Sequence, residues 1–121
     1  MVDHDDLILE LNGKMLEHIG YEVLLALGGP EAIDIYKKYK NRIAAVVTTL
    51  VMPGMKGIAL IEWLHGQDPS LPIVLTSGYE PGLKEFSQSP IGQSSLIRPI
   101  MQPFSVTEIS DRLQELLNVG S

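Results

Sequence analysis

The feature that most constrains the fold is an uncharged apolar run, AAVVTT, at residues 44–49. A run of this kind, without alternating polar positions, is typical of a strand in a parallel sheet that helices cover on both faces. Other apolar runs occur at residues 23–26, 73–76 and 96–101. We predict strands at these three runs and at residues 45–49. Because proline cannot donate a ladder hydrogen bond, Pro99 should place the last strand at a sheet edge or distort it.

Helical patterns separate these strands. The first helical pattern consists of apolar residues at helical spacing, which are Ile8, Leu11, Met15, Leu16 and Ile19. Gly20 follows them as the expected C-terminal cap. A second helix is predicted to begin at Pro30, and a third covers residues 58–64. Residues 80–95 favour only a short or irregular helix. Ser105 and Glu108 form a capping box at the start of a last helix.

This alternation predicts a doubly wound α/β fold with right-handed crossovers. Since 121 residues suit one domain, we expect residues 1–121 to form a single domain. Ligands in such folds bind beyond the carboxyl ends of the strands. The candidate site therefore lies among residues 3–6, Thr49, residues 77–79 and the Gln102–Pro103 pair.

Composition excludes several classes of function. The chain has no cysteine, which excludes disulfides, thiolate metal sites and cysteine nucleophiles. Fifteen acidic residues against nine basic ones give a formal charge of −6, which argues against nucleic acid and anionic membrane surfaces as partners. No apolar run approaches the ~18–20 residues of a membrane span, and the first residues are acidic, unlike a signal peptide. We therefore expect a cytoplasmic protein.

Four motifs at the candidate loops resemble the receiver domain of response regulators. VDHD at residues 2–5 resembles the acidic turn after the first strand, and VMPGM at residues 51–55 resembles the turn after the third. LPIVLTSGY at residues 71–79 resembles the fourth strand and its hydroxyl-bearing end, in a variant similar to receivers fused to histidine kinases. QPFS at residues 102–105 resembles the family's Lys-Pro-Phe ending. The resemblance spans nearly the whole chain.

The resemblance implies a flavodoxin-like, five-stranded parallel sheet of order 2-1-3-4-5, flanked by five helices. It also implies a place in a bacterial two-component phosphorelay. Only Met1 and Val2 precede the acidic turn, so the first strand is expected to be shortened. Either the sequence is trimmed at this end or another segment fills the place of the strand.

The residues that carry the family's chemistry are largely replaced. The resemblance implies a phosphoryl-accepting aspartate, Mg²⁺ on acidic residues, a lysine and a hydroxyl. Thr49 stands at the acceptor position, His4 replaces the second acid, and Gln102 replaces the lysine. Asp3 and Ser77 are retained. The family has an aromatic switch residue in its last strand, and Pro99 stands at that position. This chain therefore has no aromatic ring there that could rotate.

We therefore predict a degenerate phosphorylation pocket without Mg²⁺, formed by Asp3, His4, Thr49, Ser77 and Gln102. Asp3 and Asp5 would be vestigial metal ligands, and Asp5 and Asp6 are explained by the dipole of the helix that follows them. A transition-metal site at His4 with Asp3 and Asp5 is a weaker alternative. The resemblance makes the Gln102–Pro103 bond a candidate for the cis form.

The favoured function is that of a pseudo-receiver: a protein-interaction module that is not an enzyme and binds no cofactor. Its partner would be a histidine kinase, another domain of the same polypeptide, or a second copy of the chain. The expected interface is the face made by the fourth helix, fifth strand and fifth helix. The alternatives are a working phosphoacceptor with atypical chemistry and, more weakly, a flavodoxin-like nucleotide or flavin domain. The last lacks support because residues 28–30 match neither dinucleotide nor phosphate-loop glycine motifs.

Overall fold

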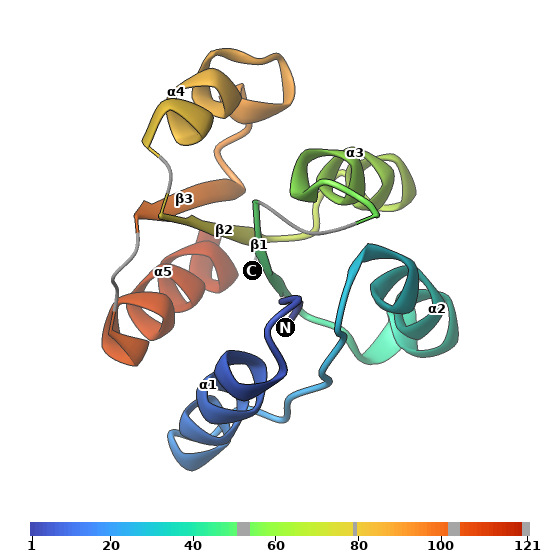
Figure 1. Cartoon of the computed structure of the whole chain (residues 1–121), viewed down its shortest axis with the longest axis vertical. Helices are drawn as coiled ribbons and strands as arrows, with labels where there is room; N and C mark the ends of the chain where they lie inside the picture. The colour runs from blue at the N-terminus through green and yellow to red at the C-terminus, as the bar shows by residue number, and fades with distance from the viewer. Residues whose placement is uncertain (51–53, 79, 102–104, 120–121) are drawn as a thin grey trace.

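The computed structural model describes residues 1–50, 54–78, 80–101 and 105–119. Its sheet has three parallel strands in the order β1 (Val46–Thr49), β2 (Ile73–Ser77) and β3 (Ile97–Met101). Figure 1 shows this sheet between two layers of helices. The parallel α/β class predicted from the apolar runs is therefore observed, with each of these strands within one or two residues of its predicted bounds.

The described residues form five α-helices around the sheet: α1 (Asp6–His18), α2 (Gly29–Tyr39), α3 (Gly57–Gln67), α4 (Glu80–Gln88) and α5 (Val106–Val119). Short 3₁₀ turns follow α2 at Lys40–Arg42 and α4 at Ile91–Gln93. Helices α1 and α5 cover one face of the sheet, and α2, α3 and α4 cover the other (Figure 1). The α4 helix is short, as the composition of residues 80–95 predicts.

The two faces of the sheet belong to two hydrophobic clusters. In β2, Ile73 and Leu75 pack toward α2, α3 and α4, while Val74 between them packs toward α1 and α5. Every residue of β1 and β2 is buried. Burial on both faces explains why these strands read as continuous apolar runs instead of alternating ones.

The predicted strand at residues 23–26 is not formed. Within this segment only Ala26 forms a bridge, and its partner is Val2, which also bridges Thr48 on the other side. The described sheet therefore has three strands, with Val2 and Ala26 as isolated bridges beyond β1, in place of the expected five. The physical reason is that a strand needs backbone partners along its whole length, and residues 1–3 supply only one rung of pairing.

Helix α1 ends as predicted, but most of the apolar residues that predicted it do not face the core. Gly20 has φ +110°, the left-handed conformation expected of a cap glycine. Leu9, Gly13 and Leu16 face the core, whereas five large apolar side chains are exposed. We call these five the α1 stripe: Leu7, Ile8, Leu11, Met15 and Ile19. The predicted apolar spacing therefore identified the helix, but among its members only Leu16 is buried.

The last strand and the last helix agree with the predictions made for Pro99 and for the capping box. Pro99 lies in β3, which pairs only with β2 among the described residues and so forms an edge of the sheet. The capping box is also present, since the Glu108 amide donates to Ser105 Oγ at 3.2 Å and the Ser105 amide donates to Glu108 Oε1 at 3.3 Å. Ile109, Leu113 and Leu116 of α5 are buried.

Gly57 should not tolerate a side chain. Its amide donates to the Leu50 carbonyl at 2.8 Å, and a Cβ at this position would collide with the Thr49 carbonyl oxygen and the Leu50 backbone. We expect Gly57→Ala to lower the free energy of unfolding by about 1–3 kcal/mol, the usual cost of overpacking. Gly66, in the same helix, has open space, so Gly66→Ala should raise that energy by about 0.5–1 kcal/mol. Urea unfolding of both variants tests this difference, and equal midpoints would contradict it.

Candidate functional site

The carboxyl ends of the strands bring three of the predicted site residues to one edge of the sheet. Thr49 ends β1 and Ser77 ends β2, where Thr49 is in register with Thr76. Asp3 follows the bridging residue Val2, whose carbonyl accepts a hydrogen bond from the Thr49 amide at 3.2 Å. Asp3, Thr49 and Ser77 are all buried. The parallel topology therefore assembles this part of the predicted pocket.

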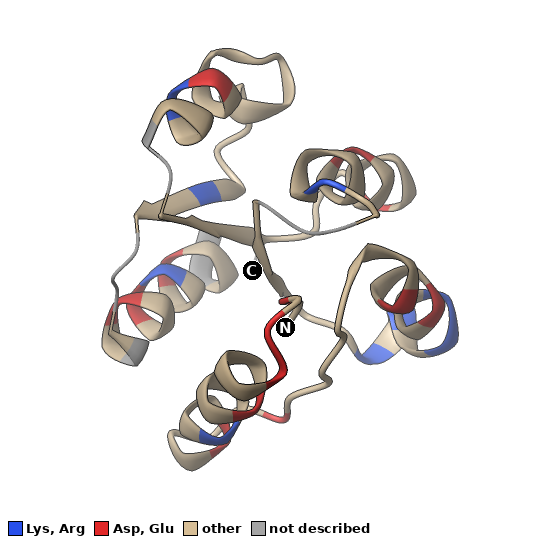
Figure 2. Ribbon diagram, in the orientation of Figure 1, with Lys and Arg blue, Asp and Glu red and all other residues tan. Residues whose placement is uncertain are grey.

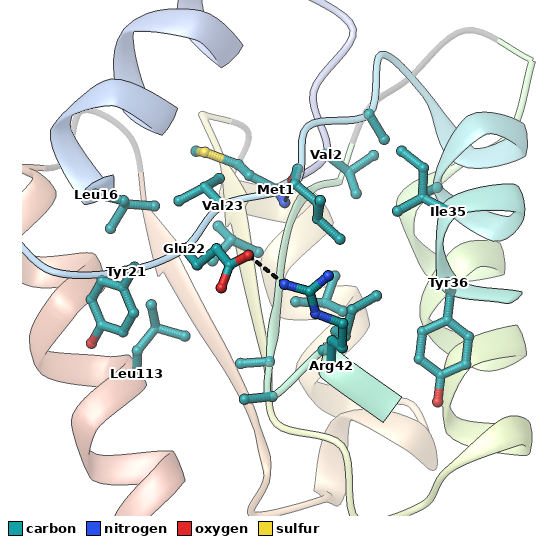
Figure 3. A pocket seen from close by; sticks show the side chains of 18 of the residues that line it. Met1, Val2, Leu16, Tyr21, Glu22, Val23, Ile35, Tyr36, Arg42 and Leu113 are labelled. Atoms are coloured by element: carbon teal, nitrogen blue, oxygen red, sulfur yellow. Dashed lines mark hydrogen bonds and ion pairs between the residues drawn. The ribbon is translucent and has the colours of Figure 1, made fainter. Parts of the chain in front are cut away.

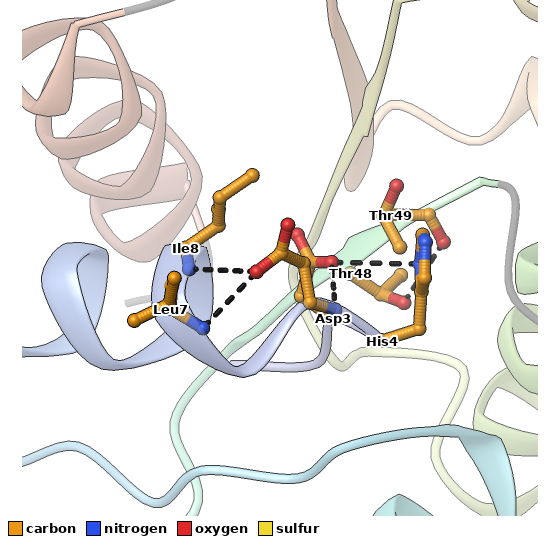
Figure 4. Close-up of polar contacts among 7 residues, drawn as sticks. Asp3, His4, Leu7, Ile8, Thr48 and Thr49 are labelled. Carbon is orange, nitrogen blue, oxygen red and sulfur yellow. Dashed lines mark hydrogen bonds and ion pairs between the residues drawn. The ribbon is translucent and has the colours of Figure 1, made fainter.

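Thr49 places a neutral hydroxyl at the end of β1. Its neighbour Thr48 is fully buried and donates its own hydroxyl to the Thr49 carbonyl at 3.2 Å (Figure 4). The Thr49 amide is thus held by the Val2 carbonyl and the Thr49 carbonyl by the Thr48 hydroxyl. What the position lacks is a carboxylate.

The buried carboxylate of Asp3 is used within its own turn. Its Oδ1 accepts the Asp5 amide at 3.0 Å and lies 3.6 Å from His4 Nδ1 (Figure 4). The His4 side chain is about half exposed, at 47%. When protonated, this imidazole would be a local counter-charge for Asp3, which is a role that a second aspartate could not fill.

Asp5 caps helix α1. Its Oδ1 accepts the amides of Leu7 at 3.0 Å and Ile8 at 3.2 Å, the geometry of an N-cap (Figure 4). Asp6 lies in the first turn, where a negative charge complements the helix dipole. The acidic segment therefore has a structural explanation, as its position in the sequence suggested. Figure 2 shows it as a red stretch leading into α1.

The described residues contain no cluster of three or more His, Asp or Glu side chains able to hold a metal ion. The weaker alternative of a transition-metal site at His4, Asp3 and Asp5 gains no support from their contacts, since Asp5 points to the helix amides. Gln102 and Pro103 lie outside the described residues, so the position of the family's lysine and the candidate cis bond are not described.

A scan against protein families matches residues 1–113 to the response regulator receiver domain. The chain belongs to this family. The match covers nearly all the described residues and agrees with the positions of Asp3, Thr49 and Ser77 at the strand ends.

Known proteins similar to this receiver domain come from plants and bacteria. It is 33% identical over 79 residues to the "Two-component response regulator-like PRR37" of Oryza sativa subsp. indica, covering 64% of this chain and 11% of that protein. It is 26% identical over 117 residues to the sensor kinase CckA of Brucella abortus, covering 97% of this chain and 12% of that protein. The structure superposes on a receiver domain from Clostridium thermocellum with a TM-score of 0.85 at 20% identity, covering 98% and 91% of the two chains, which supports the fold.

This chain is therefore a receiver domain of two-component signalling with a flavodoxin-like fold, and such domains are in general non-enzymatic signalling modules. It spans about a tenth of the length of the two curated relatives named above, at 11% and 12%. Within the described ranges, no helix is both long and apolar enough to cross a bilayer.

Sequence reasoning missed two features of the molecule. The first is the exposure of the α1 stripe, because the helical spacing indicated a helix but not which of its apolar residues are exposed. The second is an apolar pocket at the opposite, amino-terminal end of the strands, where Met1 and Val2 line one wall.

Proposed function

We propose that this receiver domain is a pseudo-receiver: it does not accept a phosphoryl group and acts as a protein-binding module in a phosphorelay. The observation that carries the proposal is Thr49, a neutral hydroxyl at the end of β1 where the family resemblance calls for a nucleophilic carboxylate. A threonine hydroxyl attacks phosphorus only when an adjacent base takes its proton. A kinase, a second domain of the same polypeptide and a second copy of the chain are the candidate partners.

The residues present do not fit the Mg²⁺ ion that receiver chemistry needs. Mg²⁺ prefers oxygen ligands in octahedral geometry, usually with one or two carboxylates. Asp3 is engaged by the Asp5 amide and lies near His4, while Asp5 is engaged as a helix cap. Thr49 supplies no charge to attract the ion.

Titration with millimolar Mg²⁺ should give no saturable response. Because the carboxylates are engaged and Thr49 is neutral, we expect flat calorimetric heats and unchanged fluorescence of Trp63, the chain's single tryptophan. The matched control is Thr49→Asp, which returns one carboxylate and should bind more tightly than the native chain. A saturable native response that disappears in Asp3→Ala would contradict the expected loss of the site.

The α1 stripe is the surface that best supports a protein-binding role. Five of the eight large exposed apolar side chains in the described residues lie on α1 or its cap. Apolar side chains clustered on one face mark interaction sites more often than isolated ones do. The face of α4, β3 and α5, which the resemblance favoured, has only Met101 among these eight.

The charges beside the α1 stripe suit a second copy of the chain in an antiparallel arrangement. Asp6 and Glu10 lie in the first half of α1, and Lys14, Glu17 and His18 lie in the second half. Two α1 helices packed antiparallel would place Lys14 of each copy toward the acidic first half of the other copy's helix. Lys14 already pairs with Glu10 at 3.0 Å in one copy, so the two pairs would form one network of four charges.

The assembly should not respond to phosphoryl chemistry. We expect sedimentation velocity to show the same self-association with and without acetyl phosphate or beryllofluoride in the presence of Mg²⁺. The reason is that a pocket without an acceptor carboxylate has nothing to hold either reagent. A clear shift in sedimentation on adding either one would show a working switch and would overturn the proposal.

A further inference from the structure

Positive charge gathers at the end of helix α2 in a chain that is acidic elsewhere. Residues 37–42 read KKYKNR and hold four of the nine basic residues of the chain and no acidic one. The rest of the chain has five basic residues against fifteen acidic ones. We call these four side chains the α2 basic patch: Lys37, Lys38, Lys40 and Arg42. Figure 2 shows blue segments gathered at the end of α2 and in the turn that follows it.

The charge of the α2 basic patch is mostly uncompensated. All four residues are exposed, and in the described part of the chain no carboxylate lies within ion-pair distance of the three lysines. Arg42 has a partner, since its Nη2 lies 2.7 Å from Glu22 Oε1 (Figure 3). Both side chains of this pair are mostly exposed, so it is easily exchanged for another pair. Glu22 balances one of the four charges, which leaves three.

The stability of α2 explains only part of this cluster. Lys37 and Lys38 lie in the last turn of the helix, where the helix dipole favours cations. Lys40 and Arg42 lie in the 3₁₀ turn beyond it, and the effect of the dipole falls off within the last turn of a helix. Four like charges within six residues also repel one another. A surface that holds them together is suited to binding an anionic group.

Two aromatic rings lie beside the lysines of the patch. Lys37 Nζ lies 6.0 Å from the centroid of the Trp63 ring, and Lys38 Nζ lies 5.3 Å from that of Tyr39. Both aromatic residues are half-buried, and Trp63 meets Tyr36 edge to face at 5.7 Å between centroids. Trp, Tyr and Arg are the residues most enriched where proteins contact one another. The patch therefore combines charge with side chains that are typical of protein interfaces.

We propose that the α2 basic patch binds a short acidic segment of a partner protein. Carboxylates of the segment would pair with the three lysines and with Arg42, which can exchange Glu22 for a carboxylate of the partner. An apolar side chain between those carboxylates would lie on the exposed parts of Trp63 and Tyr39. Complementary charges of this kind speed the encounter and select the partner.

The surroundings of the patch favour a short peptide over a long polyanion. A nucleic acid strand or an anionic bilayer extends beyond four charges and would face the acidic remainder of the chain, which repels it. Base stacking would also need the ring of Trp63, and the Lys37 ammonium already lies over that ring. A segment with a few carboxylates is confined to the patch and avoids both costs.

The patch lies at the opposite end of the sheet from the degenerate pocket. The turn Lys40–Arg42 leads into the start of β1, whereas Thr49 ends that strand. The patch also belongs to α2 and the turn after it, not to the α1 stripe. Binding at the patch is therefore independent of the proposed pseudo-receiver function, and its failure would leave the phosphorylation tests unaffected.

The test uses the peptide acetyl-Glu-Glu-Leu-Glu-Glu-amide with the full chain. We expect saturable calorimetric binding at about 50 mM salt and at least about tenfold weaker binding at about 300 mM, because salt screens the charges. The fluorescence of Trp63 should change as Lys37 turns toward a carboxylate. The matched control is acetyl-Gln-Gln-Leu-Gln-Gln-amide, which keeps the shape without the charge. Absence of binding by the glutamate peptide, or equal binding of the glutamine peptide, would overturn the proposal.

Two double variants with the same change in net charge locate the binding. Lys38→Gln with Lys40→Gln removes two charges from the patch and should weaken peptide binding by about tenfold or more. Lys56→Gln with Arg98→Gln removes two exposed charges from other parts of the chain and should weaken binding by less than about twofold. Equal weakening by the two variants would show a response to net charge alone and would overturn the patch as the site.

Two other polyanions test the class of partner. A short oligouridylate and vesicles containing phosphatidylserine are titrated against the full chain at the same salt concentrations as the peptide. Because both extend beyond the patch, we expect each to bind more weakly than the glutamate peptide. Tighter binding of either one would overturn an acidic protein segment as the occupant, in favour of nucleic acid or an anionic membrane.

Discussion

Thr49→Asp alone is expected to leave labelling by acetyl phosphate weak, whereas Thr49→Asp combined with His4→Asp and Gln102→Lys is expected to label strongly. The single change returns the nucleophile to the end of β1 but places its carboxylate in a buried position beside Asp3. Burial and a like charge both favour the protonated form, which is a poor nucleophile. His4→Asp adds a metal ligand, and Gln102→Lys adds a cation for the phosphoryl oxygens.

The expected gain from the triple variant over the single one is about 10²-fold in labelling rate, the usual effect of one or two electrostatic contacts in such sites. Radiolabel incorporation or intact mass after incubation with acetyl phosphate and Mg²⁺ measures it. The matched control is Thr49→Asn with the same two partner changes, which keeps shape and charge partners but has no nucleophile. Equal rates for the single and triple variants would refute the electrostatic account of the pocket.

Leu11→Glu should weaken self-association with little effect on stability, whereas Leu16→Ala should lower the stability of the fold. Leu11 lies on the α1 stripe with 59% of its surface exposed, while Leu16 is 3% exposed and packs against α5. Leu16→Ala should cost about 2–5 kcal/mol of unfolding free energy through lost contacts and a cavity. Leu11→Glu should change stability by no more than about 0.5 kcal/mol.

For self-association we expect the opposite order, with the larger effect from Leu11→Glu and the smaller one from Leu16→Ala. Leu11 is central in the α1 stripe, and a charge buried there should weaken the dimer by about tenfold or more. Sedimentation equilibrium and urea unfolding on both variants give the two readouts. Unchanged association of Leu11→Glu would exclude the α1 stripe as the contact between copies.

The sequence predicted the elements whose partners are local or central. The β1 and β2 strands were predictable because burial on both faces makes them uniformly apolar. The Ser105–Glu108 capping box was predictable because its hydrogen bonds lie within one helical turn. The strand at residues 23–26 was not predictable, because forming it depends on a neighbour that residues 1–3 do not supply.

Helix α1 shows a second limit. Its apolar residues surround more than half of the helix, so spacing alone indicates a helix but not which side faces the sheet. Gly13 decides this, because its lack of a side chain lets Leu25 approach that face: a Cβ there would lie 2.8 Å from Leu25 Cδ2. For the candidate site, topology predicted that Asp3, Thr49 and Ser77 converge, but not that Asp3 and Asp5 are already engaged by backbone amides.

The central claim is that the native chain cannot be phosphorylated. Intact-mass spectrometry after incubation with acetyl phosphate and Mg²⁺ tests it most directly, with the triple variant as the positive control in the same experiment. We predict that the native chain keeps its mass while the triple variant gains one phosphoryl group. A phosphoryl adduct on the native chain that is lost in Thr49→Val would contradict the account and would establish Thr49 as an acceptor.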